Sequence, residues 1–417
     1  MCGRLNTHAP ERTEFRYLTM RTTCRGCASK NLIQIIDFGS VPLAGGFLSS
    51  LEKAKDERLY PLPVHVCGDC ALVQILEPVD PEILFQDYSF SSSTIKPLVD
   101  HFEAYAKWLV DNFQPRKVVE FGCNDGILIE PLKASGVTAA GVDVSVNITE
   151  MARQKSLDVT AGYFNRDMAA GIKSRLGEVD IVTGSNAFAH NDHPELILEA
   201  AADILSREGH LCLEVMYAGD LLDQIQWDTL YHEHLTFYSL SSLSVLLRRY
   251  GFHVVRAQRI PMHGGSLRIA ATRAPNASAG GDVLQLLEYE KKSGLDRAET
   301  WTAFGTGVFR KISIVKEVFG SLSKQHSIWA YGAAGKATMW VNVCEMDYLG
   351  GVVDASPLRA GKFMPGTHTP IVFPEEFRRT PPDYMFVSAW NYADLIRSKE
   401  SWYPGTWSTP LPDLRFF

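Results

Sequence analysis

The sequence of 417 residues lacks any apolar run that approaches the roughly 20 residues of a membrane-spanning helix. Residues 1–20 are charged and polar, unlike a signal peptide. Positive charge is not in excess either, because 41 Lys and Arg face 48 Asp and Glu and the net charge is −7 at pH 7. This balance gives no electrostatic reason to expect nucleic acid or an anionic membrane as the main partner. We therefore expect a cytoplasmic monomer that binds neither.

Cysteine is also scarce, since eight unevenly spaced residues in a chain of this length exclude the disulfide framework of a small secreted protein. Four of them nevertheless form two Cys-x-x-Cys pairs, Cys24 with Cys27 and Cys67 with Cys70. Thiolates at this spacing favour tetrahedral zinc, with a mononuclear iron or a redox dithiol as the alternatives. Because sulfur would fill all four coordination positions, the pattern predicts a structural zinc ion.

The chain has the composition of a globular protein, with 46% apolar and 21% charged residues. Its length exceeds what one hydrophobic core usually organises, so we expect several domains. We divide it into an extension over 1–20, a β-rich zinc-binding module over 21–84, a central domain over 85–290 and a C-terminal domain over 291–417.

Strand and helix patterns alternate in the central and C-terminal domains. In the first series, strands are predicted at 117–121, 138–143, 180–185 and 210–215, with helices at 128–135, 147–154 and 194–205. In the second series, strands are predicted at 328–331, 350–354, 371–373 and 383–388, with a helix at 334–344. Such alternation indicates parallel sheets covered by helices, so the predicted fold class is α/β with two Rossmann-like units. The polar stretch 280–319 between them predicts one or two connecting helices.

The segment VVEFGCNDG at 118–126 places a strand, a glycine turn and a helix start in succession. Asp143 ends the next predicted strand, where a carboxylate can accept both hydroxyls of a ribose. The turn has Gly122, Asn124 and Gly126 instead of the three glycines that hold a pyrophosphate. Together with Glu120 it matches the first motif of class I methyltransferases, which predicts S-adenosylmethionine as the cofactor. A nucleotide-binding or purely structural βαβ unit is the alternative.

Asn186 and Phe188 follow the strand predicted at 180–185. Ligands in such sheets bind beyond the carboxyl ends of the strands. We therefore expect these two residues to border the reactive methyl group of the cofactor.

Titratable side chains are concentrated in the segment 227–238, where Tyr231, His232, Glu233 and His234 occupy consecutive positions. Packing alone does not explain this density. A second polar cluster, which begins at His190, leaves the preceding strand and should converge on the same edge of the sheet. Metal binding is disfavoured, because His232 and His234 point in opposite directions in an extended chain and no third ligand is evident.

The sequence resembles the S-adenosylmethionine-dependent C-methyltransferases that act on nucleotide-linked keto-deoxysugars and carry an N-terminal zinc-binding domain. The resemblance covers residues 24 to about 412. It rests on the two cysteine pairs, VEFGCNDG, the tetrad YHEH, and the segments YGAAGK and PGTHTPI. It implies a class I Rossmann-like central domain between a small zinc-binding β module and a C-terminal Rossmann-like domain.

The same resemblance implies methylation of a carbon beside the ketone of a nucleotide-linked sugar, with dTDP as the expected nucleotide. It assigns His234 as the base, and Tyr231, Glu233 and His190 complete the site. A carbon becomes nucleophilic only as an enolate, so the site needs a base of near-neutral pKa and donors aimed at the developing oxyanion. Glu233 can orient a neighbouring imidazole, and Tyr231 or His190 can donate to the oxyanion.

In the C-terminal domain the strand predicted at 328–331 is followed by a glycine turn that carries Lys336 near the start of a helix. By resemblance this domain holds the nucleotide diphosphate of the sugar, with Lys336 as a phosphate partner and Asn342 as a further polar candidate. His263 and Ser266 in the central domain are expected to face the sugar.

Three other functions compete with this interpretation. The first is an O- or N-methyltransferase acting on a nucleotide sugar, which needs only a base near a hydroxyl or amine. The second is an NAD-dependent sugar enzyme, which the missing three-glycine fingerprint disfavours. The third is a zinc-stabilised interaction scaffold, which the crowded tetrad disfavours.

Overall fold

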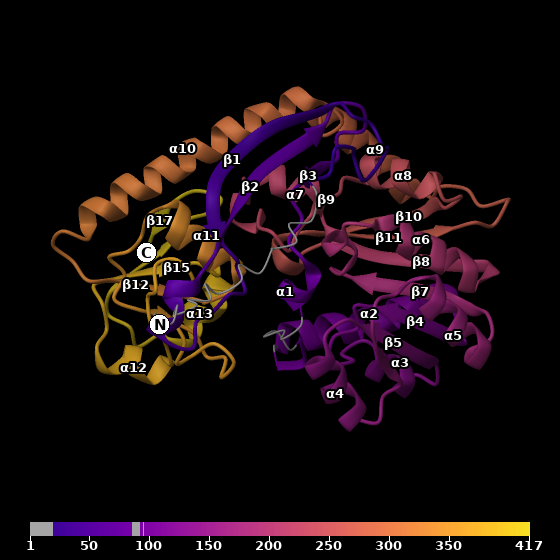
Figure 1. Cartoon of the computed structure of the whole chain (residues 1–417), viewed down its shortest axis with the longest axis horizontal. Coiled ribbons are helices and arrows are strands. Elements are labelled where there is room, and N and C mark those ends of the chain that lie inside the picture. Colours follow the sequence, from indigo (N-terminus) through magenta and orange to yellow (C-terminus); the bar gives the residue numbers. More distant parts are fainter. Residues whose placement is uncertain (1–19, 86–91, 95) are drawn as a thin grey trace, which may run out of the picture.

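The computed structural model describes residues 20–85, 92–94 and 96–417, which are arranged around three β-sheets (Figure 1). The extension predicted at 1–20 lies outside the described residues except for Met20. Among the helices of the described residues, none is both long and apolar enough to cross a membrane.

The zinc-binding module is a four-stranded antiparallel sheet of order β1-β2-β3-β9. Its strands are β1 (Leu32–Pro42), β2 (Leu59–Cys67), β3 (Val73–Ile75) and β9 (Thr236–Phe237). The hairpin β1–β2 encloses the short helix η1 (Leu51–Asp56), and α1 (Pro81–Phe85) follows β3. The last strand, β9, comes from the segment that carries the tetrad, more than 150 residues further along the chain.

The central domain has a seven-stranded sheet of order β10-β11-β8-β7-β4-β5-β6. Its strands are β4 (Lys117–Phe121), β5 (Thr138–Asp143), β6 (Val159–Ala161), β7 (Val179–Ser185), β8 (Leu205–Met216), β10 (His253–Ile260) and β11 (Ser266–Thr272). The run from β6 to β8 is parallel, and β11 is antiparallel to both of its neighbours. The chain winds outward from β4 in both directions, so a crevice is expected beyond the carboxyl ends of β4 and β7.

Helices cover both faces of this sheet, because successive residues of a strand point to opposite sides. Val118 packs against α2 and α3, whereas Val119 packs in a separate core with α5, α6 and α8. The helices are α2 (Lys96–Phe113), α3 (Ile129–Ala134), α4 (Val146–Gln154), α5 (Arg166–Leu176), α6 (Pro194–Ile204), α7 (Ala218–Asp223) and α8 (Leu240–Arg248).

The C-terminal domain repeats the doubly wound arrangement on a smaller scale, with strand order β14-β13-β12-β15-β16-β17. The first five strands are parallel and β17 is antiparallel. The strands are β12 (Ile328–Tyr331), β13 (Val352–Val353), β14 (Ile371–Val372), β15 (Tyr384–Val387), β16 (Thr406–Thr409) and β17 (Arg415–Phe416). Its helices are α11 (Gly335–Val343), α12 (Pro374–Arg379) and α13 (Ala393–Lys399).

Two helices connect the domains, α9 (Gly281–Ser293) and the 25-residue α10 (Ala298–Leu322). Figure 1 shows α10 running beside the curved β1–β2 hairpin from the central domain to the C-terminal domain. Gly305 permits this approach, since a Cβ there would lie 2.1 Å from the carbonyl oxygen of Ile35. Trp301 and Val308 of α10 share one core with Val64 of the zinc module and Ala330 of the C-terminal sheet. The predicted α/β fold with a zinc-binding module and two Rossmann-like units is confirmed.

Candidate active site

The four cysteines of the zinc module converge, and their Sγ atoms all lie within 4.8 Å of one another. Sγ of Cys24 lies 3.6 Å from that of Cys70, and Sγ of Cys27 lies 3.5 Å from that of Cys67. A tetrahedral zinc with Zn–S bonds of about 2.3 Å places its sulfurs about 3.8 Å apart. The backbone N–H of Gly26 also donates to Cys24 Sγ at 3.3 Å, as expected beside a thiolate. This donor set fits zinc.

A buried ion pair connects the first zinc knuckle to the loop that carries His190. The side chain of Arg25 is fully buried, and its Nη2 lies 2.7 Å from Oδ1 of Asp192. Its Nη1 donates to the carbonyl oxygen of Ile75 at 2.6 Å. Asp192, which follows His190 in the sequence, therefore anchors this loop to the zinc module.

The glycine turn after β4 is shaped by Asp143. Gly122 and Gly126 have φ values of +65° and +82°, which glycine adopts without strain. The backbone N–H of Asn124 donates to Asp143 Oδ2 at 2.9 Å, and a second backbone N–H donates to Oδ1. A Cβ at Gly122 would lie 2.2 Å from that of Ala187, so the turn touches the loop after β7.

Buried polar atoms without partners among the described residues gather at the carboxyl ends of β4 and β7. They are Oε2 of Glu120, Oγ of Ser185 and Oδ1 of Asn186. Burial raises the pKa of Glu120 well above its usual value. Buried polar atoms are normally hydrogen-bonded, so this edge of the sheet suits a polar ligand, and a positive charge on that ligand would favour the ionised form of Glu120. The amino, sulfonium and hydroxyl groups of S-adenosylmethionine fit this description.

Phe188 lies elsewhere than the sequence suggested. It is fully buried in the core, with its ring centroid 6.4 Å from that of Phe121 and 5.7 Å from that of Tyr238. It supports the loop from within the core, whereas Asn186 directly follows the carboxyl end of β7.

The orientation of the His234 ring is fixed by the backbone. Its Nδ1 lies 2.7 Å from the carbonyl oxygen of Thr229. A carbonyl oxygen only accepts, so Nδ1 carries the proton and Nε2 keeps a lone pair. The ring centroid lies 4.0 Å from that of Tyr231 and 5.1 Å from that of His190. Burial, followed by the charge on His190, lowers the pKa of His234 well below its usual value, so the ring is neutral near pH 7.

The other residues of the tetrad face different surroundings. His232 is buried and its Nε2 lies 3.2 Å from the carbonyl oxygen of Pro61 in the zinc module. Burial raises the pKa of Glu233 to about 7. Its Oε1 lies near Gly45, where a Cβ would come within 3.3 Å. Among the described residues no hydrogen bond joins Glu233 to a histidine, so the Thr229 carbonyl, and not Glu233, orients His234.

The C-terminal domain reaches the tetrad through the start of α11. A Cβ at Gly335 would lie 2.8 Å from Cζ of Tyr231, so the two segments are in contact. The Nζ of Lys336 is buried, has no hydrogen-bond partner in the described chain, and lies 4.6 Å from the ring centroid of Trp390. The indole of Trp390 in turn donates to Asp228 Oδ2 at 2.8 Å.

His263 lines a cavity of about 570 Å³ together with Trp390 and Arg259, between the central and C-terminal domains. Burial lowers the pKa of His263 to about 4, and the same cause lowers that of His190 to about 4. Ser266 is fully buried, and its hydroxyl donates to the carbonyl oxygen of Met262. Through this hydrogen bond, Ser266 stabilises the loop that carries His263.

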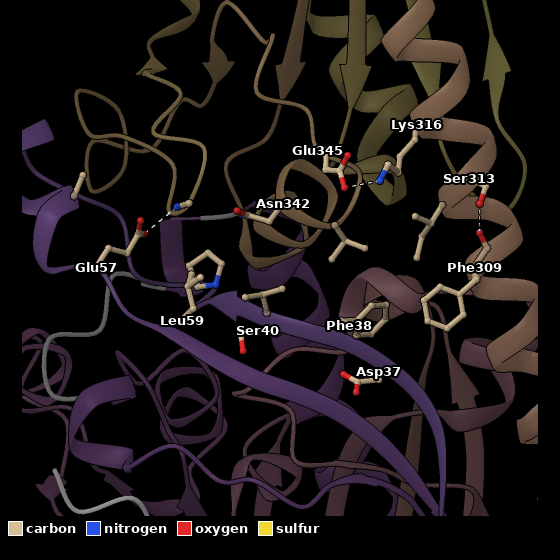
Figure 2. A pocket seen from close by; sticks show the side chains of 16 residues that line it. Asp37, Phe38, Ser40, Glu57, Leu59, Phe309, Ser313, Lys316, Asn342 and Glu345 are labelled. Atoms are coloured by element: carbon tan, nitrogen blue, oxygen red, sulfur yellow. Dashed lines mark hydrogen bonds and ion pairs between the residues drawn. The ribbon is translucent and has the colours of Figure 1, made fainter.

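Asn342 lies apart from this cluster, in a cavity of about 650 Å³ between β1, η1, α10 and α11 (Figure 2). Its amide donates to the carbonyl oxygens of Thr338 at 2.8 Å and Pro365 at 3.0 Å. The same cavity holds the ion pair between Lys316 and Glu345, with an N–O distance of 2.6 Å. The structure does not bring Asn342 together with Lys336.

Sequence reasoning missed a charged triad at the end of β8. Glu214 is fully buried, and its carboxylate accepts from His101 at 2.8 Å and from Arg268 at 2.6 Å. Burial alone would raise the pKa of Glu214, but these partners hold it below its usual value. The charge of His101 also contributes to lowering the pKa of His263. His101 lies on α2, 133 positions from His234, so the sequence spacing could not indicate that it belongs near the site. Asp228, in contrast, adjoins the tetrad in the sequence and could have been considered.

The sheet order, the glycine turn with its carboxylate and the neighbouring unpaired polar atoms define a class I S-adenosylmethionine-dependent methyltransferase. Family profiles agree: one described as a methyltransferase domain matches residues 95–257, and one described as a C-methyltransferase C-terminal domain matches 261–412. A zinc binding domain profile matches residues 24–85.

The C-methyltransferase NovU of Streptomyces niveus is 30% identical to the chain over 402 residues, which cover 94% of this chain and 96% of that protein. The chain belongs to the C-methyltransferase family that carries an N-terminal zinc-binding domain. The predicted cofactors, S-adenosylmethionine and structural zinc, are confirmed.

Two other known methyltransferases are similar to part of the chain. The ubiquinone biosynthesis O-methyltransferase of Cupriavidus pinatubonensis is 31% identical over 124 residues, which are 29% of this chain and 50% of that protein. The magnesium protoporphyrin IX methyltransferase of Synechocystis PCC 6803, solved with bound S-adenosylmethionine, is 18% identical and aligns with 42% of this chain and 79% of that one. Its TM-score is 0.33, too low to support an argument.

Proposed function

We propose that the protein methylates a carbon beside the ketone of a nucleotide-linked keto-deoxysugar, with dTDP as the expected nucleotide, through an enolate formed by His234. One observation carries the proposal: the Thr229 carbonyl holds Nδ1–H, so a neutral imidazole presents an unprotonated Nε2 beside Tyr231 and His190. Methyl transfer to a hydroxyl would not need an enolate, because the oxygen is already nucleophilic.

The proposed reaction begins when His234 Nε2 takes the proton from the carbon next to the ketone. The C–H electron pair becomes a C=C bond, and the carbonyl electrons move to oxygen as an enolate. Tyr231 and His190 flank His234 and can donate to that oxygen. When bound, S-adenosylmethionine would supply the electrophilic methyl group: the enolate carbon would form the new C–CH₃ bond as the ketone re-forms, and the S–CH₃ bond would break with its electron pair left on sulfur, so that neutral S-adenosylhomocysteine is released.

The proposed cofactor contacts follow the crevice at the ends of β4 and β7. Asp143 is placed for the ribose, while Gly122 and Gly126 allow close approach of the backbone. Glu120 and Asn186 have buried oxygens without a partner among the described residues there, and Asn124 lies in the turn between Gly122 and Gly126. The loop 186–191 links this crevice to His234, because Ala187 adjoins Gly122 and His190 stacks beside His234.

The test supplies the enzyme with S-adenosylmethionine labelled with ¹³C in its methyl group and with a set of nucleotide-linked keto-deoxysugars. NMR then locates the label. We expect a new C–CH₃ group on a carbon next to the ketone, and no product from the same sugars after the ketone is reduced to an alcohol. Label found on oxygen or nitrogen, without solvent deuterium entering the sugar, would favour the O- or N-methyltransferase alternative.

A further inference from the structure

A buried lysine whose amino group has no hydrogen-bond partner among the described residues lies beside the tetrad. Lys336 is the second residue of α11, and its neighbour Gly335 touches Tyr231. The Nζ atom is buried and has no hydrogen-bond partner within the described residues. The charge of Lys336 contributes to lowering the pKa values of both His234 and His263, which places it within electrostatic reach of both imidazoles. The C-terminal domain therefore supplies a cation to the site in the central domain.

The protein does not neutralise this cation by direct contact. The nearby carboxylate is Asp228, and its Oδ2 accepts the indole N–H groups of Trp340 at 2.9 Å and Trp390 at 2.8 Å. No ion pair joins Lys336 to a carboxylate in the described chain, and its Nζ instead lies 4.6 Å from the centroid of the Trp390 ring. A buried charge without a partner is costly, so a fold that keeps one provides it for a ligand that brings negative charge.

We propose that Lys336 is a further catalytic residue, whose ammonium donates a hydrogen bond to the substrate oxygen that becomes negative when His234 removes the proton from the adjacent carbon. The inference rests on the proposed function. In this step the proton passes from carbon to His234 Nε2, the C–H pair forms the C=C bond, and the negative charge moves to the oxygen facing Lys336. A cation already in place stabilises that charge without reorganisation at the moment of reaction.

This role differs from binding the diphosphate of the sugar. A diphosphate is charged in both the ground state and the transition state, so a lysine that binds it strengthens substrate binding. An oxyanion exists only after deprotonation, so a lysine that binds it accelerates the reaction instead. The two roles are therefore separated by a comparison of binding with deprotonation.

The experiment uses the full-length zinc-loaded enzyme and the variant Lys336→Met, with dTDP-4-keto-6-deoxyglucose as the probe. NMR follows exchange of the protons next to the ketone with D₂O, and calorimetry measures the affinity for dTDP alone. Loss of one oxyanion donor typically slows a reaction by about 10²–10³-fold. We expect exchange to slow by at least about 100-fold, with dTDP affinity changed less than about threefold. Lys336→Gln gives the same comparison if the methionine variant is unstable.

The matched control is Lys316→Met, because Lys316 lies in the separate cavity of Figure 2 and is paired with Glu345. This variant should exchange protons at the unaltered rate. Unaltered exchange in Lys336→Met, or weaker dTDP binding with normal exchange at saturation, would overturn the role of Lys336 and leave the proposed function intact. Absence of exchange with the unaltered enzyme would instead contradict the proposed function, and this inference with it.

Discussion

Arg25 and Asp192 form an ion pair that joins the zinc-binding module to the loop bearing His190, although 167 positions separate them. A second link joins the same module to His234, because Gln74 of β3 pairs with Thr236 of β9, two positions after that histidine. Both histidine segments are therefore fixed to one zinc-stabilised sheet. The zinc module is part of the frame of the site, even though its metal is saturated by sulfur.

Asp192→Asn should weaken this frame. The variant leaves the Arg25 guanidinium buried without its counter-charge, and breaking such a pair costs roughly 3–5 kcal/mol. We expect the free energy of unfolding, measured by denaturant titration, to fall by about this amount, with a slower methyl transfer and unchanged zinc content. Asp203→Asn is the control, because Asp203 pairs with Arg166 at the exposed surface and such pairs contribute less than about 1 kcal/mol. Equal losses in both variants would contradict the structural role of Asp192.

Cys24→Ser should lower the zinc content and the thermal stability of the protein. Metal binding is coupled to folding in such modules and contributes on the order of 10 kcal/mol in isolated zinc-binding peptides. We expect metal analysis to show a loss of zinc, and thermal unfolding to begin at a lower temperature. Cys344→Ser, which alters a buried thiol outside the module, should keep its zinc. Full zinc occupancy in Cys24→Ser would show that this sulfur is not a ligand.

In each of the two Rossmann-like units, one aspartate accepts hydrogen bonds from two backbone N–H groups. Asp143 accepts backbone N–H groups from Asn124 and Ser145, each at 2.9 Å. In the C-terminal domain Asp354 accepts from Ala333 and Ser356, each at 2.8 Å. The chain thus provides a matched pair of carboxylates, of which we propose that only Asp143 contacts the cofactor.

Asp143→Asn should therefore weaken binding of S-adenosylmethionine, while Asp354→Asn should not. A hydrogen bond to a charged group contributes about 1.5–3 kcal/mol, or roughly 10- to 100-fold in affinity. Both variants disturb equivalent backbone contacts, so the comparison isolates the ligand contact from damage to the turn. Calorimetry measures the affinity. A similar loss in both variants, or in neither, would show that the ribose contact is misplaced.

The sequence was most informative for the strands that alternate regularly with helices. The strands predicted at 117–121 and 328–331 coincide with β4 and β12. Short strands such as β6 and β16 gave no such signal. Nor did β9, because its two residues become a strand only by pairing with β3. The convergence of His190 and His234 was predictable, since carboxyl ends of neighbouring parallel strands share one edge of a sheet.

The interactions that tune the site were not predictable, because they join residues far apart in the chain. Trp390 reaches Asp228 from a different domain, and Arg25 reaches Asp192 from the zinc module. The acceptor for His234 is a backbone carbonyl, which a residue pattern cannot reveal. A residue pattern also could not reveal that the ring of Phe188 packs in the core or that the amide of Asn342 donates to the carbonyl of Pro365.

The stability contributed by His232 should depend on pH. Burial lowers the pKa of His232 to about 4, whereas the unfolded value is about 6.5. The unfolded chain therefore binds more protons between these values, and stability is lost as the pH falls below 6.5. We expect the difference in unfolding free energy between the unaltered protein and His232→Gln to shrink by about 1.4 kcal/mol from pH 7.5 to 5.5. A constant difference would mean that folding does not shift the pKa of His232.

His234→Ala should stop chemistry without preventing the binding of either ligand. A positioned general base contributes on the order of 10²–10⁴ in rate, so turnover and exchange of the protons next to the ketone should both fall at least that much. Affinity for S-adenosylmethionine, measured by calorimetry, should stay within a few fold, because in the proposed site the imidazole acts on the sugar and not on the cofactor. Exchange isolates deprotonation from methyl transfer, so it identifies the step that is lost.

His232→Gln is the matched control for the base, since His232 belongs to the same tetrad but contacts the carbonyl of Pro61 in the zinc module. It should retain proton exchange. The neutral state of His234, which burial maintains, also predicts that kcat/KM shows no loss from protonation of this ring between pH 7.5 and 6.5. Near-normal exchange in His234→Ala, combined with its loss in His190→Ala or Tyr231→Phe, would require the base to be reassigned to one of these neighbours.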